Sequence, residues 1–168
     1  MLNRRALLLT GTAIAVTGAY ALWRPAANAK QGDGTKVFEI TRTEAEWREI
    51  LSEEQFYVLR EHGTERAFTS PLNDNKAAGF YHCAGCDLPL YSSETKYDSG
   101  TGWPSFWAPL DNAVGTTTDY LIGYPRTEVH CRRCGGHLGH IFGDGPPPTG
   151  KCHCINGVAL KFVAKKTG

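Results

Sequence analysis

This sequence of 168 residues contains a single methionine, Met1. Acidic residues are absent before Asp33, so the first 29 residues carry positive charge alone, at Arg4, Arg5 and Arg24. An excess of basic residues is also missing. Without those three arginines, 15 Lys and Arg stand against 17 Asp and Glu, a net charge of −2. A nucleic-acid partner, which would favour a basic patch, is therefore not expected.

A helical hydrophobic period is missing after Gly63, no internal repeat is visible, and low complexity is confined to Pro146–Pro148. Short apolar or alternating segments follow instead, separated by Gly, Pro, Asn and Asp. This spacing is typical of antiparallel sheet. The segments are residues 79–82, 88–91, 113–122, 126–131, 138–142 and 152–163. The length suits one domain with a buried core, which we expect to be mainly β.

Two short helices are predicted ahead of this sheet. Thr43 and Glu46 form a capping-box signature, which should begin a helix that runs to about Leu51. Trp47, Ile50 and Leu51 share its inner face. We expect both helices to pack against the β domain.

The second helix has the same signature. Ser52 and Gln55 should begin it, and residues 62–63 (His-Gly) should end it. Helical periodicity turns Phe56 and Leu59 toward the core.

The first 29 residues have the pattern of a secretory signal. Arg4 and Arg5 precede a moderately hydrophobic run, Ala6 to Leu22, and residues 27–29 (Ala-Asn-Ala) have the small-x-small pattern of a signal-peptidase site. The paired arginines resemble the twin-arginine type, which exports folded proteins. Such a route suits a protein that folds around a metal with free thiols in a reducing cytosol.

An uncleaved anchor helix is the alternative reading of this segment, although the run is marginal for a bilayer span. We predict a signal at residues 1–29, a polar linker at residues 30–40 and a folded domain at residues 41–168. The domain would then act in the periplasm or another extracytoplasmic space, or on a membrane if the signal is retained.

Six cysteines form two Cys-x-x-Cys pairs and one Cys-x-Cys: Cys83 and Cys86, Cys131 and Cys134, Cys152 and Cys154. Two Cys-x-x-Cys turns can present four thiolates to one tetrahedral metal, which suits a structural zinc with no open position. Disulfides are the alternative after export. A thioredoxin-like pair would lie at a helix N-terminus, whereas these pairs fall in turns between strands.

The Cys-x-Cys follows a Pro- and Gly-rich segment that cannot be regular structure. If residues 152–163 form one strand, its even positions share a face: Cys152, Cys154, Asn156, Val158, Leu160 and Phe162. The far end of that face is apolar, and the near end carries two thiols and a carboxamide. A thiol at a strand end beside a rigid loop is a candidate nucleophile, and a buried small hydrophobe is the alternative.

Two further segments carry groups suited to a thiol site. Trp103 lies in a glycine-rich loop, where an indole can form the wall of a pocket or belong to the core. His137 and His140 lie three residues apart, with Asp144 just beyond. An imidazole near a thiol lowers its pKa or supplies a proton, although each histidine alone suits a structural hydrogen bond. The prediction of a site therefore depends on the whole set, centred on Cys154.

From about Trp47 to Val163 the chain resembles the B-type methionine-R-sulfoxide reductases. The resemblance lies in residues 55–58, 63–68, 81–83, 89–91, 96–100, 102–106 (Gly-Trp-Pro-Ser-Phe), 126–129, 137–142 (His-Leu-Gly-His-Ile-Phe), 144–146, 148–150 and 154–156 (Cys-Ile-Asn). These segments cover most of the chain after the signal, in order, and together they are highly specific.

The resemblance implies a β-tent-like fold of two antiparallel sheets, with one zinc on the four Cys-x-x-Cys cysteines. It implies an oxidoreductase of oxidative stress and protein repair that reduces methionine R-sulfoxide, free or in proteins and peptides. The resemblance also implies a redox-active nucleophile at Cys154, with His140 and Asn156 as further catalytic residues. It implies that the substrate lies near Trp103, His137 and Asp144. A thioredoxin-like or small-thiol reductant and a monomeric enzyme are expected.

Two departures from the family pattern concern turnover. Thr101 stands where many members carry a resolving cysteine, and Cys152-His153 stand where Arg-Tyr is usual. The Cys154 sulfenic acid that the reaction leaves must condense with another thiol. Cys152 is then the resolving candidate within the chain. An exported zinc-binding module, or a thiol-disulfide oxidoreductase without sulfoxide chemistry, is the alternative function.

Overall fold

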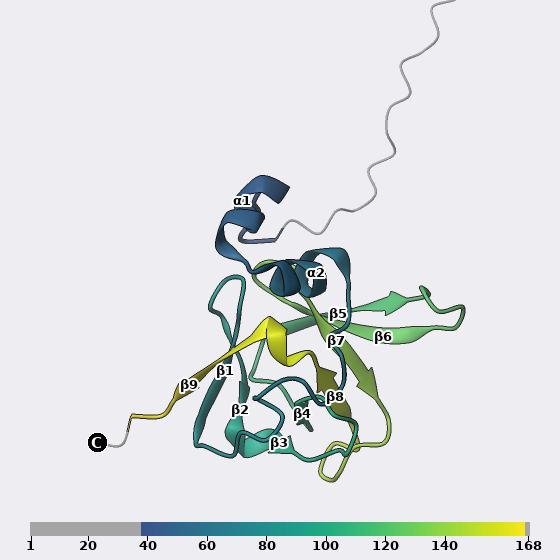
Figure 1. Cartoon of the computed structure of the whole chain (residues 1–168). Helices are drawn as coiled ribbons and strands as arrows, with labels where there is room; N and C mark the ends of the chain where they lie inside the picture. Colours follow the sequence, from purple (N-terminus) through teal and green to yellow (C-terminus); the bar gives the residue numbers. More distant parts are fainter. Residues whose placement is uncertain (1–37, 167–168) are drawn as a thin grey trace, which may run out of the picture. The chain divides into compact units, whose positions relative to one another are not determined.

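The computed structural model describes residues 38–166, so the predicted signal and nearly all of the linker lie outside the described residues. Within residues 38–166 the chain forms two antiparallel sheets and two short α-helices (Figure 1). The prediction of a mainly β domain with antiparallel sheets and two short helices is confirmed. No helix in this range is long and apolar enough to cross a bilayer.

The helices are α1 (Glu44–Ile50) and α2 (Glu53–Glu61). Thr43 caps the first and Ser52 the second, each through a reciprocal pair of hydrogen bonds with the residue three positions later. α2 ends at His62, whose left-handed backbone (φ 56°) turns the chain away from the helix axis. Both predicted helices are confirmed, with bounds within about a residue of those expected.

The inner face of α1 differs from the prediction at one position. Trp47 and Leu51 are buried as expected, but the side chain of Ile50 is 50% exposed. The prediction for Ile50 was wrong because the helix ends there and Leu51 already has extended backbone (ψ 144°). The turn directs Leu51 into the core and leaves Ile50 at the surface.

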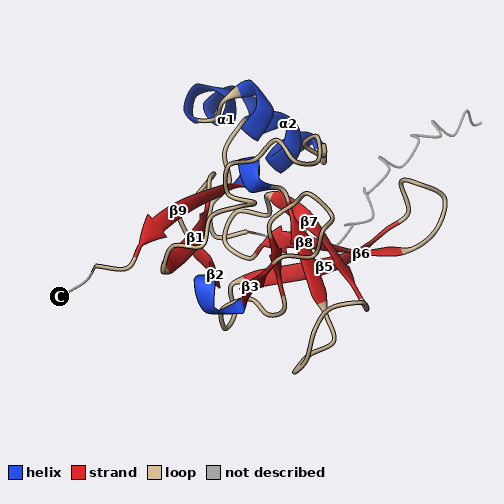
Figure 2. Ribbon diagram, turned by 60° about the horizontal axis from the view of Figure 1, so that its bottom comes forward, coloured by secondary structure: helices blue, strands red, loops and turns tan. Residues whose placement is uncertain are grey.

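The larger sheet has six strands in the order β3-β4-β8-β7-β6-β5, and every neighbouring pair is antiparallel. The strands are β3 (Lys96–Tyr97), β4 (Ser105–Phe106), β5 (Val114–Asp119), β6 (Arg126–Cys131), β7 (His137–Phe142) and β8 (Cys152–Ile155). The β5–β6 hairpin extends beyond the rest of the sheet (Figures 1 and 2). The two-residue strands β3 and β4 border a glycine-rich segment that sequence reasoning treated as loop.

The smaller sheet has the order β2-β1-β9, with β1 (Gly79–Cys83), β2 (Pro89–Ser92) and β9 (Leu160–Ala164). Aromatic side chains join the two sheets. The ring of Phe106, in β4, stacks on Tyr91 at 4.3 Å and meets the edge of Tyr81 at 5.0 Å. All three side chains are fully buried, so the core lies between the sheets.

The predicted continuous strand at residues 152–163 is in fact two strands in different sheets. β8 ends at Ile155, a 3₁₀ turn occupies Gly157–Ala159, and β9 begins at Leu160. The carboxylate of Glu65 accepts hydrogen bonds from the backbone N–H groups of residues 157 and 158. These donors therefore need no neighbouring strand, and the shared face of even positions ends at Cys154.

One glycine makes the pairing of β7 with β8 possible. A Cβ on Gly139 would lie 2.1 Å from the carbonyl oxygen of Cys154 and 3.0 Å from the Cα of Ile155. Both are backbone atoms in the paired strand, so they cannot move aside without breaking the ladder.

We therefore predict that Gly139→Ala destabilises the domain by roughly 1–3 kcal/mol, the usual cost of overpacking. Denaturant unfolding measures this free energy. Gly143→Ala is the matched control, since a Cβ there meets nothing within 4 Å. Equal unfolding midpoints for the two variants would contradict the prediction.

Candidate active site

Cys154, the third residue of β8, lies at a small cavity of about 140 Å³. The cavity is lined by Thr64, Trp103, Arg126, Gly139, His140, Phe142, Cys154 and Asn156. The structure thus brings together the thiol, imidazole, indole and carboxamide that sequence reasoning grouped. A larger hollow of about 650 Å³ beside α2 has no thiol or imidazole in its lining.

Strand register explains this convergence. β8 lies between β4 and β7, and Cys154 is directly opposite Ser105 on one side and His140 on the other. Trp103 comes just before β4, and Asn156 comes just after β8. Segments that are up to about fifty residues apart therefore meet at one point of the sheet.

The Cys154 thiol is protonated at neutral pH. Burial raises its pKa above the ordinary value, and hydrogen bonds from Thr101 and Ser105 oppose this only in part. The Thr101 hydroxyl lies 3.7 Å from the sulfur. A nearby imidazole could either lower the pKa of the thiol or supply a proton. Because the pKa of Cys154 is raised, the site holds no resting thiolate, and the supply of a proton is the role that fits.

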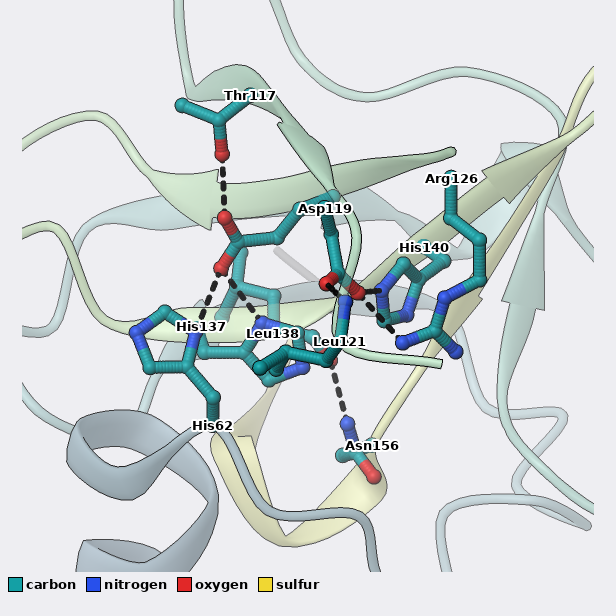
Figure 3. A network of polar contacts seen from close by, with 10 residues as sticks. His62, Thr117, Asp119, Leu121, Arg126, His137, Leu138, His140 and Asn156 are labelled. Atoms are coloured by element: carbon teal, nitrogen blue, oxygen red, sulfur yellow. Dashed lines mark hydrogen bonds and ion pairs between the residues drawn. The ribbon is translucent and has the colours of Figure 1, made fainter. Parts of the chain in front are cut away.

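His140 is held in one orientation by a carboxylate. Its Nε2–H donates to Asp119 at 2.8 Å, and Asp119 also pairs with Arg126 (Figure 3). Burial lowers the pKa of His140, although the Asp119 hydrogen bond works against this, so the imidazole is neutral at neutral pH. Hydrogen bonds from the Leu121 N–H and from His140 lower the pKa of Asp119 to about 2. Nδ1 is left as the ring nitrogen free to exchange a proton.

His137 lies outside the cavity. It donates through Nδ1 to Glu128 at 2.7 Å, and His62 approaches the same oxygen at 3.1 Å (Figure 3). Burial alone would raise the pKa of Glu128, but hydrogen bonds from His137, His62 and Thr117 hold it well below its usual range. The His137 ring packs edge-on against His140 at 5.4 Å, so it supports the site from behind.

Asp144 and Cys152 lie together in a second, adjacent hollow of about 310 Å³. Thr101 also lines this hollow and contacts the Cys154 sulfur, so it borders both sites. Cys152 is buried, with 3% of its surface exposed, whereas Cys154 is partly exposed. The structure therefore places Asp144 beside Cys152 rather than in the cavity.

Glu65, to which no motif assigned a role, anchors two cavity residues. Its backbone N–H donates to Asn156 Oδ1 at 3.0 Å, and its carbonyl accepts from Trp103 Nε1 at 3.1 Å. Asn156 Nδ2 donates to the Leu138 carbonyl at 2.9 Å. One N–H of the carboxamide remains for a ligand. Glu65 lies in a segment that carried the family resemblance, which was the available signal.

The four Cys-x-x-Cys thiols form a separate cluster. Cys83 and Cys131 end β1 and β6, and their turns bring in Cys86 and Cys134. All four sulfurs lie within 4.8 Å of one another, at 3.7 Å for Cys83 and Cys134 and 3.5 Å for Cys86 and Cys131. A tetrahedral site with Zn–S bonds of about 2.3 Å separates sulfurs by about 3.8 Å.

These separations fit a bound metal and are far longer than the ~2.05 Å of a disulfide. The cysteines are all unpaired thiols in residues 38–166. Because β1 belongs to the smaller sheet and β6 to the larger, a metal here would join the two sheets. The cluster could hold an ion such as zinc, and it offers four protein ligands with no open position.

The described residues thus hold a thiol in a small cavity, separate from a four-sulfur cluster. The SelR domain model matches residues 51–164, so the chain belongs to the SelR domain family. The chain is also similar to proteins named peptide methionine sulfoxide reductase MsrB. That of Pseudomonas putida (strain W619) is 56% identical over 125 residues, 74% of this chain and 94% of the relative.

Two further relatives carry the same name. The protein of Thiobacillus denitrificans (strain ATCC 25259 / T1) is 55% identical over 125 residues, 74% of this chain and 95% of the relative. That of Agrobacterium fabrum (strain C58 / ATCC 33970) is 51% identical over 125 residues, 74% of this chain and 93% of the relative. In each case the match covers nearly the whole relative.

Proposed function

We propose that Cys154 is the nucleophile with which this protein reduces methionine R-sulfoxide, free or in peptides and proteins, to methionine. The single observation that carries the proposal is the convergence of Cys154, His140, Trp103 and Asn156 on a cavity of about 140 Å³. The names of the relatives support this substrate. An exported zinc-binding module would not need such a cavity, and neither would a thiol-disulfide oxidoreductase.

The reaction conserves atoms and protons without an added reagent. The Cys154 sulfur attacks the sulfoxide sulfur and forms a transient S–S bond, while the sulfoxide oxygen takes up the thiol proton. The oxygen then moves to the Cys154 sulfur as the S–O bond to methionine and the S–S bond break, which leaves a Cys154 sulfenic acid and methionine. The thiol proton reaches the sulfoxide oxygen through His140, which is the general acid. Trp103 holds the S-methyl group and so sets the stereochemistry. The remaining N–H of Asn156 orients the sulfoxide oxygen.

The two residues outside the cavity have indirect roles in this scheme. His137 keeps Glu128 ionised and supports the His140 ring. Asp144 lies beside Cys152 and is available to substrate only through the second hollow.

The pH profile follows from the two pKa shifts. The pKa of Cys154 is above its ordinary 9.0, and that of His140 is below its ordinary 6.5. Neutral thiol and neutral imidazole therefore predominate between these values. Below this range a protonated His140 cannot accept the thiol proton, and above it a thiolate with neutral imidazole leaves no proton for the oxygen.

We expect kcat/KM for a small R-sulfoxide to be flat between pH 6.5 and 9.0 and to fall on both sides. The measurement is a pH profile with saturating reductant. A rate that rises about tenfold per pH unit through neutrality would show that the thiolate fraction alone limits the reaction, against this scheme.

We also assign one structural zinc to the four-sulfur cluster and a β-tent-like arrangement to the sheets. The sulfur separations support the zinc, which would supply folding free energy and no catalytic step.

The purified protein should contain about one zinc per chain. Cys83→Ser should remove it and cost more than about 3 kcal/mol of stability, because metal binding is part of folding. Metal analysis and denaturant unfolding test this, with Cys152→Ser, outside the cluster, as the control. A metal-free protein with two disulfides and undiminished stability would refute the assignment.

Regeneration of Cys154 is proposed to use Cys152. Thr101 cannot resolve a sulfenic acid, and a zinc in the four-sulfur cluster would hold four of the other thiols. Residues two apart in a strand have Cα atoms about 6.6 Å apart, at the limit for a disulfide. The start of β8 would therefore have to unravel locally. The bond would be strained and easily reduced by a thioredoxin-like protein or a small thiol.

After one turnover without reductant, mass spectrometry should show a Cys152–Cys154 disulfide, and Cys152→Ser should accumulate sulfenic acid. The competing route is direct attack on the sulfenic acid by an external thiol. Normal turnover of Cys152→Ser with a protein dithiol would establish that route and exclude Cys152.

For the segment outside the described residues, we propose that a twin-arginine-type signal directs a monomeric enzyme to the periplasm or another extracytoplasmic space. Arg4 and Arg5 and the Ala-Asn-Ala sequence at residues 27–29 support this.

A further inference from the structure

The turn between β5 and β6 is apolar and exposed. Tyr120, Leu121, Ile122 and Tyr124 are 67%, 76%, 51% and 58% exposed. Turns are normally built from small and polar residues, and contiguous exposed apolar side chains mark interaction sites. This turn is the tip of the hairpin that extends beyond the sheet (Figures 1 and 2).

The turn is connected directly to the candidate active site. Asp119 precedes it and Arg126 follows it, and Arg126 lines the cavity. One oxygen of Asp119 accepts the Leu121 N–H at 2.7 Å, and the other accepts His140 at 2.8 Å (Figure 3). A single carboxylate therefore fixes both the start of the turn and the proposed acid.

Other exposed aromatic side chains lie around the same cavity. Phe142 lines it and is 42% exposed, and Phe68 is 71% exposed and packs beside Gly102, next to Trp103. We call the exposed set the apolar rim: Phe68, Tyr120, Leu121, Ile122, Tyr124 and Phe142. It contains six of the ten large exposed hydrophobic residues in the described part of the chain. These residues are therefore concentrated in the apolar rim rather than spread evenly over the surface.

The cavity is too small for more than one side chain, so the rest of a polypeptide substrate would have to lie on the apolar rim. About 140 Å³ is well below the ~300–1,000 Å³ of typical ligand sites, so it admits one side chain. A separate hollow of about 480 Å³ is lined by Tyr120 and Leu121, together with His62 and Glu128. Asp119 also lines it and bonds to His140 of the cavity, so the Asp119–His140 pair connects the two hollows, and this one can take a neighbouring side chain.

We infer that the apolar rim binds the residues that flank an oxidised methionine in a polypeptide, and that it selects apolar or aromatic flanking residues. The inference rests on the proposed role of Cys154. Residues 120–125 carry no charge, so they offer nothing to attract charged flanks. Their continuity with the cavity favours a segment of the substrate itself over a separate partner.

The test compares three substrates of the zinc-loaded protein with a saturating small dithiol. Two peptides of equal length and charge carry one methionine R-sulfoxide, flanked by Leu and Phe in one and by Ser and Gly in the other. N-acetylmethionine R-sulfoxide, which has no flanking residues, reports the chemistry. We expect kcat/KM about tenfold higher for the apolar peptide, mainly through KM, from the burial of one or two side chains.

The double variant Ile122→Ser/Tyr124→Ser should abolish this preference and leave N-acetylmethionine R-sulfoxide reduced at the wild-type rate. The matched control is Ile50→Ser/Val163→Ser, which removes two exposed apolar side chains from α1 and β9. It should keep the preference.

Equal kcat/KM for the two peptides in the wild type would overturn the inference, as would an equal loss on all three substrates. A defect that appears only with a protein dithiol would assign the rim to the reductant instead. If the wild type bound lipid vesicles and the double variant did not, with the same kinetics on both peptides, the apolar rim would be a membrane-binding surface instead. A folded wild type that reduces none of the three substrates would refute the proposed function itself, and the rim with it.

Discussion

The register between β7 and β8 is the constraint on which the site depends. It places His140 opposite Cys154, and it requires a residue without a side chain at Gly139, where the two backbones meet. Side chains alternate along a strand, so a slip of one residue would exchange the faces. His153, now buried against Tyr91, would replace Cys154 at the cavity.

The β5–β6 hairpin supplies the charges behind this arrangement. Asp119 and Glu128 lie on its two strands, and each holds a histidine of β7 through a short hydrogen bond (Figure 3). Both carboxylates have lowered pKa values, so both remain ionised while the imidazole of His140 stays neutral. The hairpin therefore fixes which nitrogen of His140 faces Asp119, a condition for directional proton transfer.

Local signals in the sequence predicted local structure well. The capping boxes at Thr43 and Ser52 gave both helices, and the two Cys-x-x-Cys pairs gave a four-sulfur cluster whose geometry fits a metal. The grouping of Cys154, His140, Trp103 and Asn156 at one cavity also followed from the sequence, through the motifs of the family.

What the sequence could not show depends on contacts between distant segments. The strand after Cys152 breaks because Glu65, about ninety residues earlier, satisfies two backbone donors. Asp119 had no motif to mark it, since its role exists only once the hairpin pairs and β7 joins β6. Separation of Asp144 from the cavity likewise follows from the path of the loop before β8 rather than from its distance in sequence.

The central claim is that the Cys154 sulfur takes the oxygen from a sulfoxide of one configuration. The most direct measurement supplies an equal mixture of the two methionine sulfoxide epimers in a short peptide and follows each epimer by chromatography. At the same time, mass spectrometry follows the oxidation state of Cys154. We expect the wild type to consume only the R epimer and to show one added oxygen, or the disulfide that follows from it, at Cys154, and we expect Cys154→Ser to consume neither epimer. Reduction by Cys154→Ser, or consumption of the S epimer at an equal rate, would contradict it.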